Sequence, residues 1–178
     1  LSARILRCVG EPAKRFQEDA LRLLRAVRFA ARLDFAIEPN TWNAVCALAP
    51  TIQYISAERH RDELNAMLLG ERPWVAIEMM RRSGLLHWLL PEIESMVGVE
   101  QSREYHPEGD VYTHTLLVLQ HVDPRTLHTM WGALLHDVGK PATMKRDAAT
   151  GKVSFYDHAS VGAVIAEGIL SRLKFSND

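Results

Sequence analysis

The stretch from Glu18 to Phe29, EDALRLLRAVRF, places acidic and arginine side chains at helical spacing. Asp19 and Arg22 are three residues apart, so on a helix they lie one turn apart and can act together. A carboxylate accepts a hydrogen bond from an exocyclic amine, and a guanidinium donates to ring nitrogens and carbonyl oxygens. The pair therefore suits cytosine or adenine, which carry the amine, and disfavours uracil and guanine. Arg25 and Arg28 add positive charge for a triphosphate or a nucleic-acid backbone.

The same stretch also has a purely structural interpretation, which the spacing leaves open. Acid and arginine side chains one turn apart stabilise an ordinary solvent-exposed helix by about 0.2–0.5 kcal/mol per pair. The apolar residues that recur at intervals of three and four residues are Leu21, Leu24, Val27 and Ala31. This period predicts a helix with one buried face, running from Glu18 or Asp19 to about Leu33.

A second group of residues, histidines and an aspartate in the second half of the chain, suits a divalent metal ion. His114 lies in the helical pattern YTHTLLVLQHV, His136 and Asp137 end the pattern MWGALLHDVG, and His158 lies in FYDHASVGA. Adjacent helical residues differ by about 100° in direction, so His136 and Asp137 can share a metal only with ligands from neighbouring helices. His114 and His158 are available for this. We expect His87, His106, His121 and His128 to be surface or core histidines.

Composition indicates an ordinary globular protein. The chain has 178 residues, 47% hydrophobic and 24% charged, with a formal net charge of −1, which fits one domain or two small ones. Positive charge is concentrated from Arg4 to Arg32, with eight Lys or Arg against three Asp or Glu. Cys8 and Cys46 form no CxxC motif, so we expect reduced thiols in a cytoplasmic protein. No apolar run is long enough to span a membrane, and the first residue, Leu1, suggests a piece of a longer protein.

The sequence predicts that the connecting segments are mainly helical. We expect a loop or strand end over Leu1–Phe16 because Gly10 and Pro12 interrupt it, and a turn over Asp34–Asn40 with Thr41 as a possible helix cap. The further predicted helical segments are Thr41–Leu48, a helix opening at Ser56 and ending at Gly70, Trp74–Ser83, and the two histidine-bearing patterns. We expect Leu85–Glu92 to be a short buried segment that Pro91 stops.

The segment RCVGEPAKRFQEDALRLLRAVRFAARLDF resembles the neck-entry region of bacterial tRNA nucleotidyltransferases and their poly(A) polymerase relatives. The resemblance implies that the EDxxR motif, here Glu18, Asp19 and Arg22, selects CTP and ATP, with Glu18 in a supporting role, and that Arg25 and Arg28 contact the nucleotide. The segment SAERHRDEL resembles the family pattern that supports this helix. That implies a supporting role for a set of charged residues, Glu58, Arg59, Arg61 and Glu63, which the residue types alone would place on a solvated face.

The second half resembles the HD phosphohydrolase superfamily as it occurs in long bacterial tRNA nucleotidyltransferases. The resemblance implies that His114, His136 and Asp137 bind a divalent transition metal, with His158 as a fourth or second-metal ligand and Lys140 or a histidine steadying a phosphate. Ala159 follows His158 where close relatives often carry Glu, and Asp178 does not match the superfamily's distal Asp. A complete and an incomplete metal site therefore both stay open.

Together these resemblances imply an all-α fold, with a helical neck bundle over residues 1–95 and an HD-type domain over 108–178 that is incomplete at its C-terminus; the helical pattern lapses between Ile93 and Pro107. The family's catalytic head, which holds Mg²⁺, has no counterpart motif here, so none of these residues would catalyse nucleotidyl transfer. The implied function is part of an enzyme that adds CMP and AMP to tRNA 3′ ends, with tRNA, CTP and ATP as partners and no membrane. Alternatives are a metal-dependent HD phosphohydrolase acting on nucleotides or 2′,3′-cyclic phosphates, or a structural module that holds tRNA.

Overall fold

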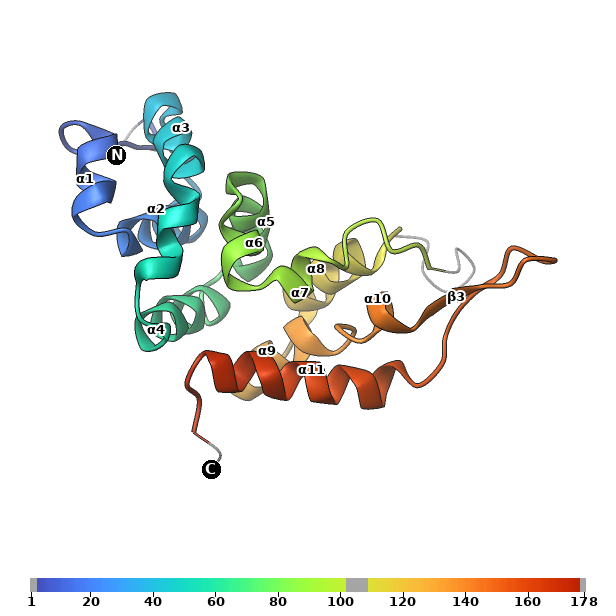
Figure 1. The fold of residues 1–178 in the computed structure, drawn as a ribbon. Helices are drawn as coiled ribbons and strands as arrows, with labels where there is room; N and C mark the ends of the chain where they lie inside the picture. The colour runs from blue at the N-terminus through green and yellow to red at the C-terminus, as the bar shows by residue number, and fades with distance from the viewer. Residues whose placement is uncertain (1–2, 102–108, 177–178) are drawn as a thin grey trace. The chain divides into compact units, whose positions relative to one another are not determined.

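The structure is a computed structural model and describes residues 3–101 and 109–176. The described part of the chain is built of helices and two two-stranded sheets (Figure 1), which confirms the predicted all-α class. The chain divides into two compact units, Leu1–Leu89 and Leu90–Asp178. No helix among the described residues has both the length and the apolar character needed to cross a membrane.

The first unit contains helices joined by short turns and one small parallel sheet, in which Ile5 lies opposite Ala36 and Leu6 opposite Ile37. Its elements in order are β1 (Ile5–Leu6), α1 (Pro12–Glu18), α2 (Leu21–Leu33), β2 (Ala36–Ile37), α3 (Pro39–Leu48), the 3₁₀ helix η1 (Ala49–Tyr54), α4 (Ala57–Leu68), α5 (Pro73–Ser83) and α6 (Leu85–Leu89).

Helix α2 lies at the centre of this unit and packs against α4 and α5. Its buried face includes all four apolar residues that the period predicts, and the helix ends at Leu33 as expected. The core that surrounds it is aliphatic, and its fully buried side chains include Leu23, Leu24, Ile52, Leu64, Leu68, Ile77 and Met80. Because α4 packs directly on α2, charged residues at the edges of these two faces are brought together.

Three local predictions in the first unit are wrong. Residues 12–18 form helix α1, where we expected a loop, because Pro12 occupies the start of the helix and does not interrupt it. The main helix also does not begin at Glu18: Asp19 has an extended backbone, and its Oδ1 accepts a hydrogen bond from the N–H of Leu21 at 3.1 Å. An aspartate that caps the following N–H groups favours such a break between two helices. Similarly, Glu38 caps α3 by accepting from the N–H of Thr41, so Thr41 itself is not the cap.

The second unit also consists mainly of helices, with one antiparallel hairpin. Its elements are α7 (Pro91–Glu94), α8 (Val111–His121), α9 (Leu127–Leu135), α10 (Lys140–Thr143), β3 (Met144–Arg146), β4 (Val153–Phe155) and α11 (His158–Arg172). The hairpin pairs Met144 with Phe155 and Arg146 with Val153. These three-residue strands were not predicted, because alternation over so few residues carries little signal.

The helices of the second unit are capped in ways that fix where the histidines lie. Asp110 caps α8 by accepting from the N–H of Thr113, and Thr126 forms a capping box with Thr129 at the start of α9.

After α9 the chain passes close to α11 at Gly139. A Cβ atom there would meet backbone atoms of His158 and Gly162, so only glycine allows this approach.

Candidate functional site

The charged residues of α2 meet those of α4 at Glu63, which is buried. Its Oε1 accepts from Nε of Arg25 and its Oε2 accepts from Nε of Arg28, both at 2.7 Å. The Arg28 side chain is 17% exposed and that of Arg25 is 47% exposed. The hydrogen bond and charge of Glu63 raise the pKa of Arg25. One carboxylate therefore fixes two guanidinium groups on consecutive turns of α2, and Arg25 keeps access to solvent.

The residues of the EDxxR motif are held by different partners. Nη1 of Arg22 donates to Oε2 of Glu18 at 2.7 Å and to the carbonyl of Arg15 at 2.8 Å. Nη2 of Arg59, on α4, donates to Oδ2 of Asp19 at 2.8 Å. Burial acts to raise the pKa of Asp19, but the hydrogen bonds from Arg59 and from the N–H of Leu21 outweigh it, and the pKa is lowered. Asp19 is therefore an ionised acceptor in a fixed position.

Among the described residues Asp19 and Arg22 form no ion pair with each other; each is held by another side chain. The structure thus brings three of the residues with an expected supporting role, Glu18, Arg59 and Glu63, into contact with the four predicted nucleotide-binding residues. The remaining two lie elsewhere: Glu58 is exposed, and Arg61 bonds to Asp62 at 3.1 Å. Arg15, which also donates to Glu18 at 2.7 Å, was missed because it lies in the segment where no helix was expected.

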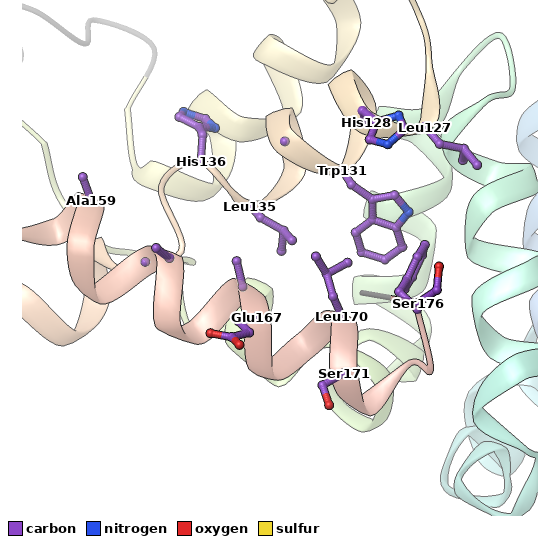
Figure 2. A pocket seen from close by; sticks show the side chains of 15 residues that line it. Leu127, His128, Trp131, Leu135, His136, Ala159, Glu167, Leu170, Ser171 and Ser176 are labelled. Atoms are coloured by element: carbon purple, nitrogen blue, oxygen red, sulfur yellow. The ribbon is translucent and has the colours of Figure 1, made fainter. Parts of the chain in front are cut away.

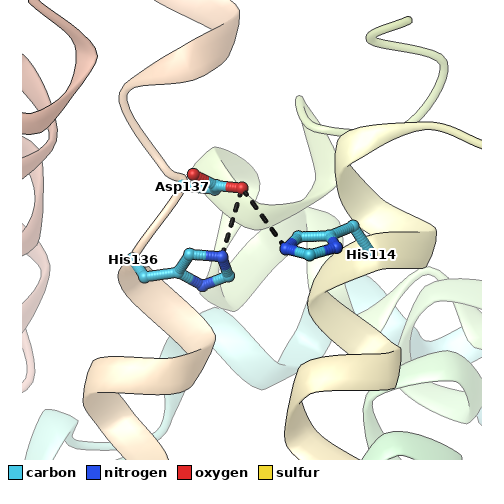
Figure 3. Close-up of side chains that lie close together, drawn as sticks. All are labelled: His114, His136 and Asp137. Carbon is cyan, nitrogen blue, oxygen red and sulfur yellow. Dashed lines mark ion pairs between the residues drawn. The ribbon is translucent and has the colours of Figure 1, made fainter. Parts of the chain in front are cut away.

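In the second unit, three of the predicted metal ligands converge. His114 comes from α8, His136 is the C-cap that follows α9, and Asp137 is the next residue; one donor atom from each lies within 4.8 Å of the others. Figure 3 shows both imidazoles turned toward the carboxylate. Oδ2 of Asp137 is 3.1 Å from Nε2 of His136 and 3.9 Å from Nε2 of His114. Nδ1 of His136 bonds to the carbonyl of Ala133 at 2.8 Å, which orients the ring and leaves Nε2 facing the cluster.

Neighbouring groups keep Asp137 charged despite its burial. The residue is 3% exposed, which by itself would raise the pKa of its carboxyl, but contacts with His136 and Lys140 outweigh burial, and the pKa falls well below its usual range. The pKa of His136 is raised because its contacts with Asp137 and the carbonyl of Ala133 exceed the opposing effect of burial. Among residues 3–101 and 109–176, no well-directed hydrogen bond reaches the buried Oδ2.

This donor set fits a divalent metal ion. Two imidazole nitrogens and a carboxylate oxygen are common ligands of zinc and similar ions, and a buried, ionised carboxylate favours a cation beside it. His158 is not part of the cluster; its Nδ1 lies 2.8 Å from the carbonyl of Phe155. His106 lies outside the described residues, and Nδ1 of His121 bonds to the carbonyl of Leu117.

Two polar residues that adjoin the cluster extend the site. Nζ of Lys140 lies 2.8 Å from Oδ2 of Asp137 and donates to Oε1 of Gln101 at 2.6 Å. Sequence reasoning considered Lys140 only as a phosphate contact and missed Gln101. No spacing signal could have identified Gln101, because it stands alone, 39 residues from its partner.

A hollow of about 960 Å³ adjoins this site, between α9 and α11. Figure 2 shows Trp131 and Leu135 of α9 facing Leu170 of α11 across it, with His136 at one end and His128 at the other. Its walls are mainly apolar. His136 is the residue that this hollow shares with the metal-type cluster.

Comparisons with known proteins match both units. Residues 34–97 match the family described as the probable RNA and SrmB-binding site of polymerase A, and residues 111–178 match the HD domain. The chain is 39% identical to an A-adding tRNA nucleotidyltransferase of Deinococcus radiodurans, over 98% of this chain and 41% of that protein. It is 36% identical to a multifunctional CCA protein of Dechloromonas aromatica, over 100% of this chain and 43% of that protein.

The chain therefore spans less than half the length of these two relatives. Among solved structures, the CCA-adding enzyme of Bacillus stearothermophilus in complex with CTP aligns over 96% of this chain and 51% of that one, with 23% identity and a TM-score of 0.46.

Proposed function

Because this chain belongs to the bacterial tRNA nucleotidyltransferase and poly(A) polymerase family, of which it contains the neck region and the HD domain, we propose that its protein adds CMP and AMP to tRNA 3′ ends in the cytoplasm without a nucleic-acid template. The first unit, Leu1–Leu89, contains the neck helices and recognises the incoming base of CTP or ATP. The second unit, Leu90–Asp178, is the HD-type unit and carries a separate site.

The observation that carries this proposal is that Asp19 and Arg22 are each fixed by another side chain. Arg59 holds the Asp19 carboxylate and Glu18 holds the Arg22 guanidinium, both through hydrogen bonds shorter than 3 Å. An acceptor and a donor that are positioned before the nucleotide arrives lose little entropy on binding. The carboxylate then accepts from the exocyclic amine of cytosine or adenine, and the guanidinium donates to the ring.

Arg25 and Arg28 complete the nucleotide site in this proposal. Their guanidiniums are anchored through Nε to Glu63, which leaves the terminal N–H groups to donate to phosphate or base oxygens. The transfer reaction itself is proposed to use Mg²⁺ held by carboxylates in another part of the protein. Within this chain the role of the four residues is to bind the nucleotide and choose between bases.

The test is nucleotide incorporation by the full-length protein onto a tRNA that lacks its 3′ CCA, with each of the four nucleotides supplied separately. Wild-type protein should add C and A. Asp19→Ala and Arg22→Ala should lose the preference for CTP and ATP over UTP and GTP, while Asp62→Ala, an exposed acid on α4, should keep it. Unchanged selectivity in the first two variants would refute the base-reading assignment.

A second activity is favoured by the cluster of His114, His136 and Asp137. We propose that the HD-type unit hydrolyses phosphoesters of nucleotides or 2′,3′-cyclic phosphates. His114, His136 and Asp137 would hold a divalent ion, which would supply an activated water for the hydrolysis. The residues of this chain orient the site: Ala133 fixes the ring of His136, and Lys140 is close enough to Asp137 to steady a phosphate beside it.

This second proposal predicts hydrolysis of 2′,3′-cyclic AMP to the 2′- or 3′-monophosphate, a reaction that requires added divalent metal and disappears in Asp137→Ala. Metal binding should be measured on the same samples by calorimetry. If wild-type protein binds no metal and does not hydrolyse 2′,3′-cyclic AMP, the unit acts as a structural module instead, and deletion of residues 108–178 should then weaken tRNA binding.

A further inference from the structure

Lys140 places a buried ammonium group directly on the carboxylate of the cluster. Its side chain is 9% exposed, and Nζ lies 2.8 Å from Oδ2 of Asp137. The same Oδ2 is the atom that both imidazoles face. One carboxylate oxygen is therefore the meeting point of two metal-type ligands and of a cationic side chain from the same chain.

The ammonium is held by more than one contact. Nζ also donates to Oε1 of Gln101 at 2.6 Å, and it lies 5.5 Å from the centre of the Phe155 ring. Gln101 is 7% exposed. Its amide must turn the oxygen toward Lys140, because an amide NH₂ facing an ammonium would be repelled. As a result Nε2 of Gln101 stays buried without a hydrogen bond among the described residues.

A divalent ion on this cluster would compete with that arrangement. A metal bound to Oδ2 and the two imidazoles would stand within a few ångströms of Nζ, and two positive charges at that separation repel strongly in a buried site. The ammonium and the metal would also bind to the same lone pairs of Oδ2. Binding of the metal to this oxygen would therefore weaken the ion pair between Asp137 and Lys140.

We propose that Lys140 is an internal cation that occupies Asp137 when no metal is bound, so that a divalent ion must displace its ammonium from Oδ2. The proposal rests on the metal site proposed above. It makes Lys140 a positioning residue that keeps the buried carboxylate paired before metal arrives and weakens metal binding. The site is then filled only when metal is abundant enough to overcome this competition.

The test is a titration of the 178-residue chain with Co²⁺, followed by visible absorption and calorimetry. Lys140→Met should bind Co²⁺ about tenfold more tightly than wild type, because the competing charge is gone. Lys140→Arg keeps the charge and should bind as weakly as wild type. The matched control is Lys145→Met, the same change at an exposed residue of β3, which should leave the affinity unchanged.

Thermal unfolding distinguishes a folding defect from the proposed effect. Without metal, Lys140→Met should unfold at a lower temperature than wild type, because Asp137 loses its partner. Saturating Co²⁺ should raise its Tm by more than it raises that of wild type. If Lys140→Met does not fold, Gln101→Leu removes only the second acceptor of the ammonium and should bind Co²⁺ a few times more tightly.

The outcomes separate this inference from the metal site itself. Wild-type binding with no gain in affinity in Lys140→Met would overturn the role of Lys140 and leave the metal site standing. A loss of affinity in Lys140→Met would also overturn it, because the ammonium would then support the metal. Absence of Co²⁺ binding in both wild type and Lys140→Met would overturn both.

Discussion

Arg59 donates to the carboxylate of Asp19 across forty residues of sequence, with Nη2 2.8 Å from Oδ2. Asp19 lies in the break between α1 and α2, whereas Arg59 lies in the first turns of α4. The contact fixes the direction of the Asp19 carboxylate. Asp19 has an extended backbone and belongs to neither helix. It links the proposed base-reading residue to the helix that supports it.

We expect Arg59→Met to relax base selection. Without Arg59 the Asp19 carboxylate keeps only the hydrogen bond from the N–H of Leu21, and small displacements of a positioning group cost on the order of tenfold to a hundredfold in rate. The ratio of kcat/KM for CTP to that for UTP in the full-length protein should fall accordingly. Arg61→Met is the control, because Arg61 bonds to Asp62. Equal loss of selectivity in both variants would contradict the assignment to Arg59.

Glu63→Gln should destabilise the first unit. The substitution replaces a buried carboxylate that accepts from both Arg25 and Arg28, and it leaves one guanidinium facing an amide NH₂. The expected loss is about 1–3 kcal/mol in the free energy of unfolding, measured in urea. Glu78→Gln removes an ion pair within α5, to Arg81, and should cost less than about 0.5 kcal/mol. Equal effects would show that burial of Glu63 adds nothing.

Gly139→Ala should disrupt the packing of α10 on α11. An added Cβ would overlap the carbonyl oxygen of His158 and lie 2.6 Å from the N atom of Gly162, both of them backbone atoms. We expect a loss of about 1–3 kcal/mol, seen as a lower Tm. Gly168→Ala on α11 has open space around it and should stabilise the protein by about 0.4–1 kcal/mol. A neutral Gly139→Ala would contradict the close approach.

The ion pair of Glu92 with Arg172 should make the second unit sensitive to acid. Arg172 donates to both carboxylate oxygens, at 2.7 and 2.8 Å. Burial acts to raise the pKa of Glu92, but the hydrogen bonds from Arg172 outweigh it, and the pKa lies below its usual value of 4.5. The stabilisation is therefore present above about pH 4.5 and is lost as the pH falls through the lowered value.

Glu92→Gln should accordingly reduce stability at pH 7 by about 1 kcal/mol and have little effect near pH 2. Thermal unfolding of wild type and variant across this range measures the difference between them. Glu167→Gln, at an exposed residue of α11, serves as the control. A difference between wild type and Glu92→Gln that does not change with pH would rule out this ion pair as its source.

Much of the fold follows from local patterns. The period of Leu21, Leu24, Val27 and Ala31 indicates the buried face of α2 correctly, since a helix in water must bury its apolar stripe. The break at Asp19 does not follow from that period, because a hydrogen bond from a single side chain to the backbone decides it. The hairpin of β3 and β4 was missed because three residues per strand are too few for a pattern.

The sequence by itself determined the residue types of both sites and their spacing along the chain: an acid and three arginines at one-turn intervals, and a His-Asp pair after a helical histidine. These features are local, and the geometry of a helix determines which of these side chains lie on the same helix face. Only the tertiary structure decided which partners hold them. That Glu63 binds two arginines and Arg59 holds Asp19 depends on the packing of α4 against α2, and the meeting of Lys140 with Gln101 depends on contacts across 39 residues. Such long-range pairings depend on how complete faces pack together, which no short stretch of sequence specifies.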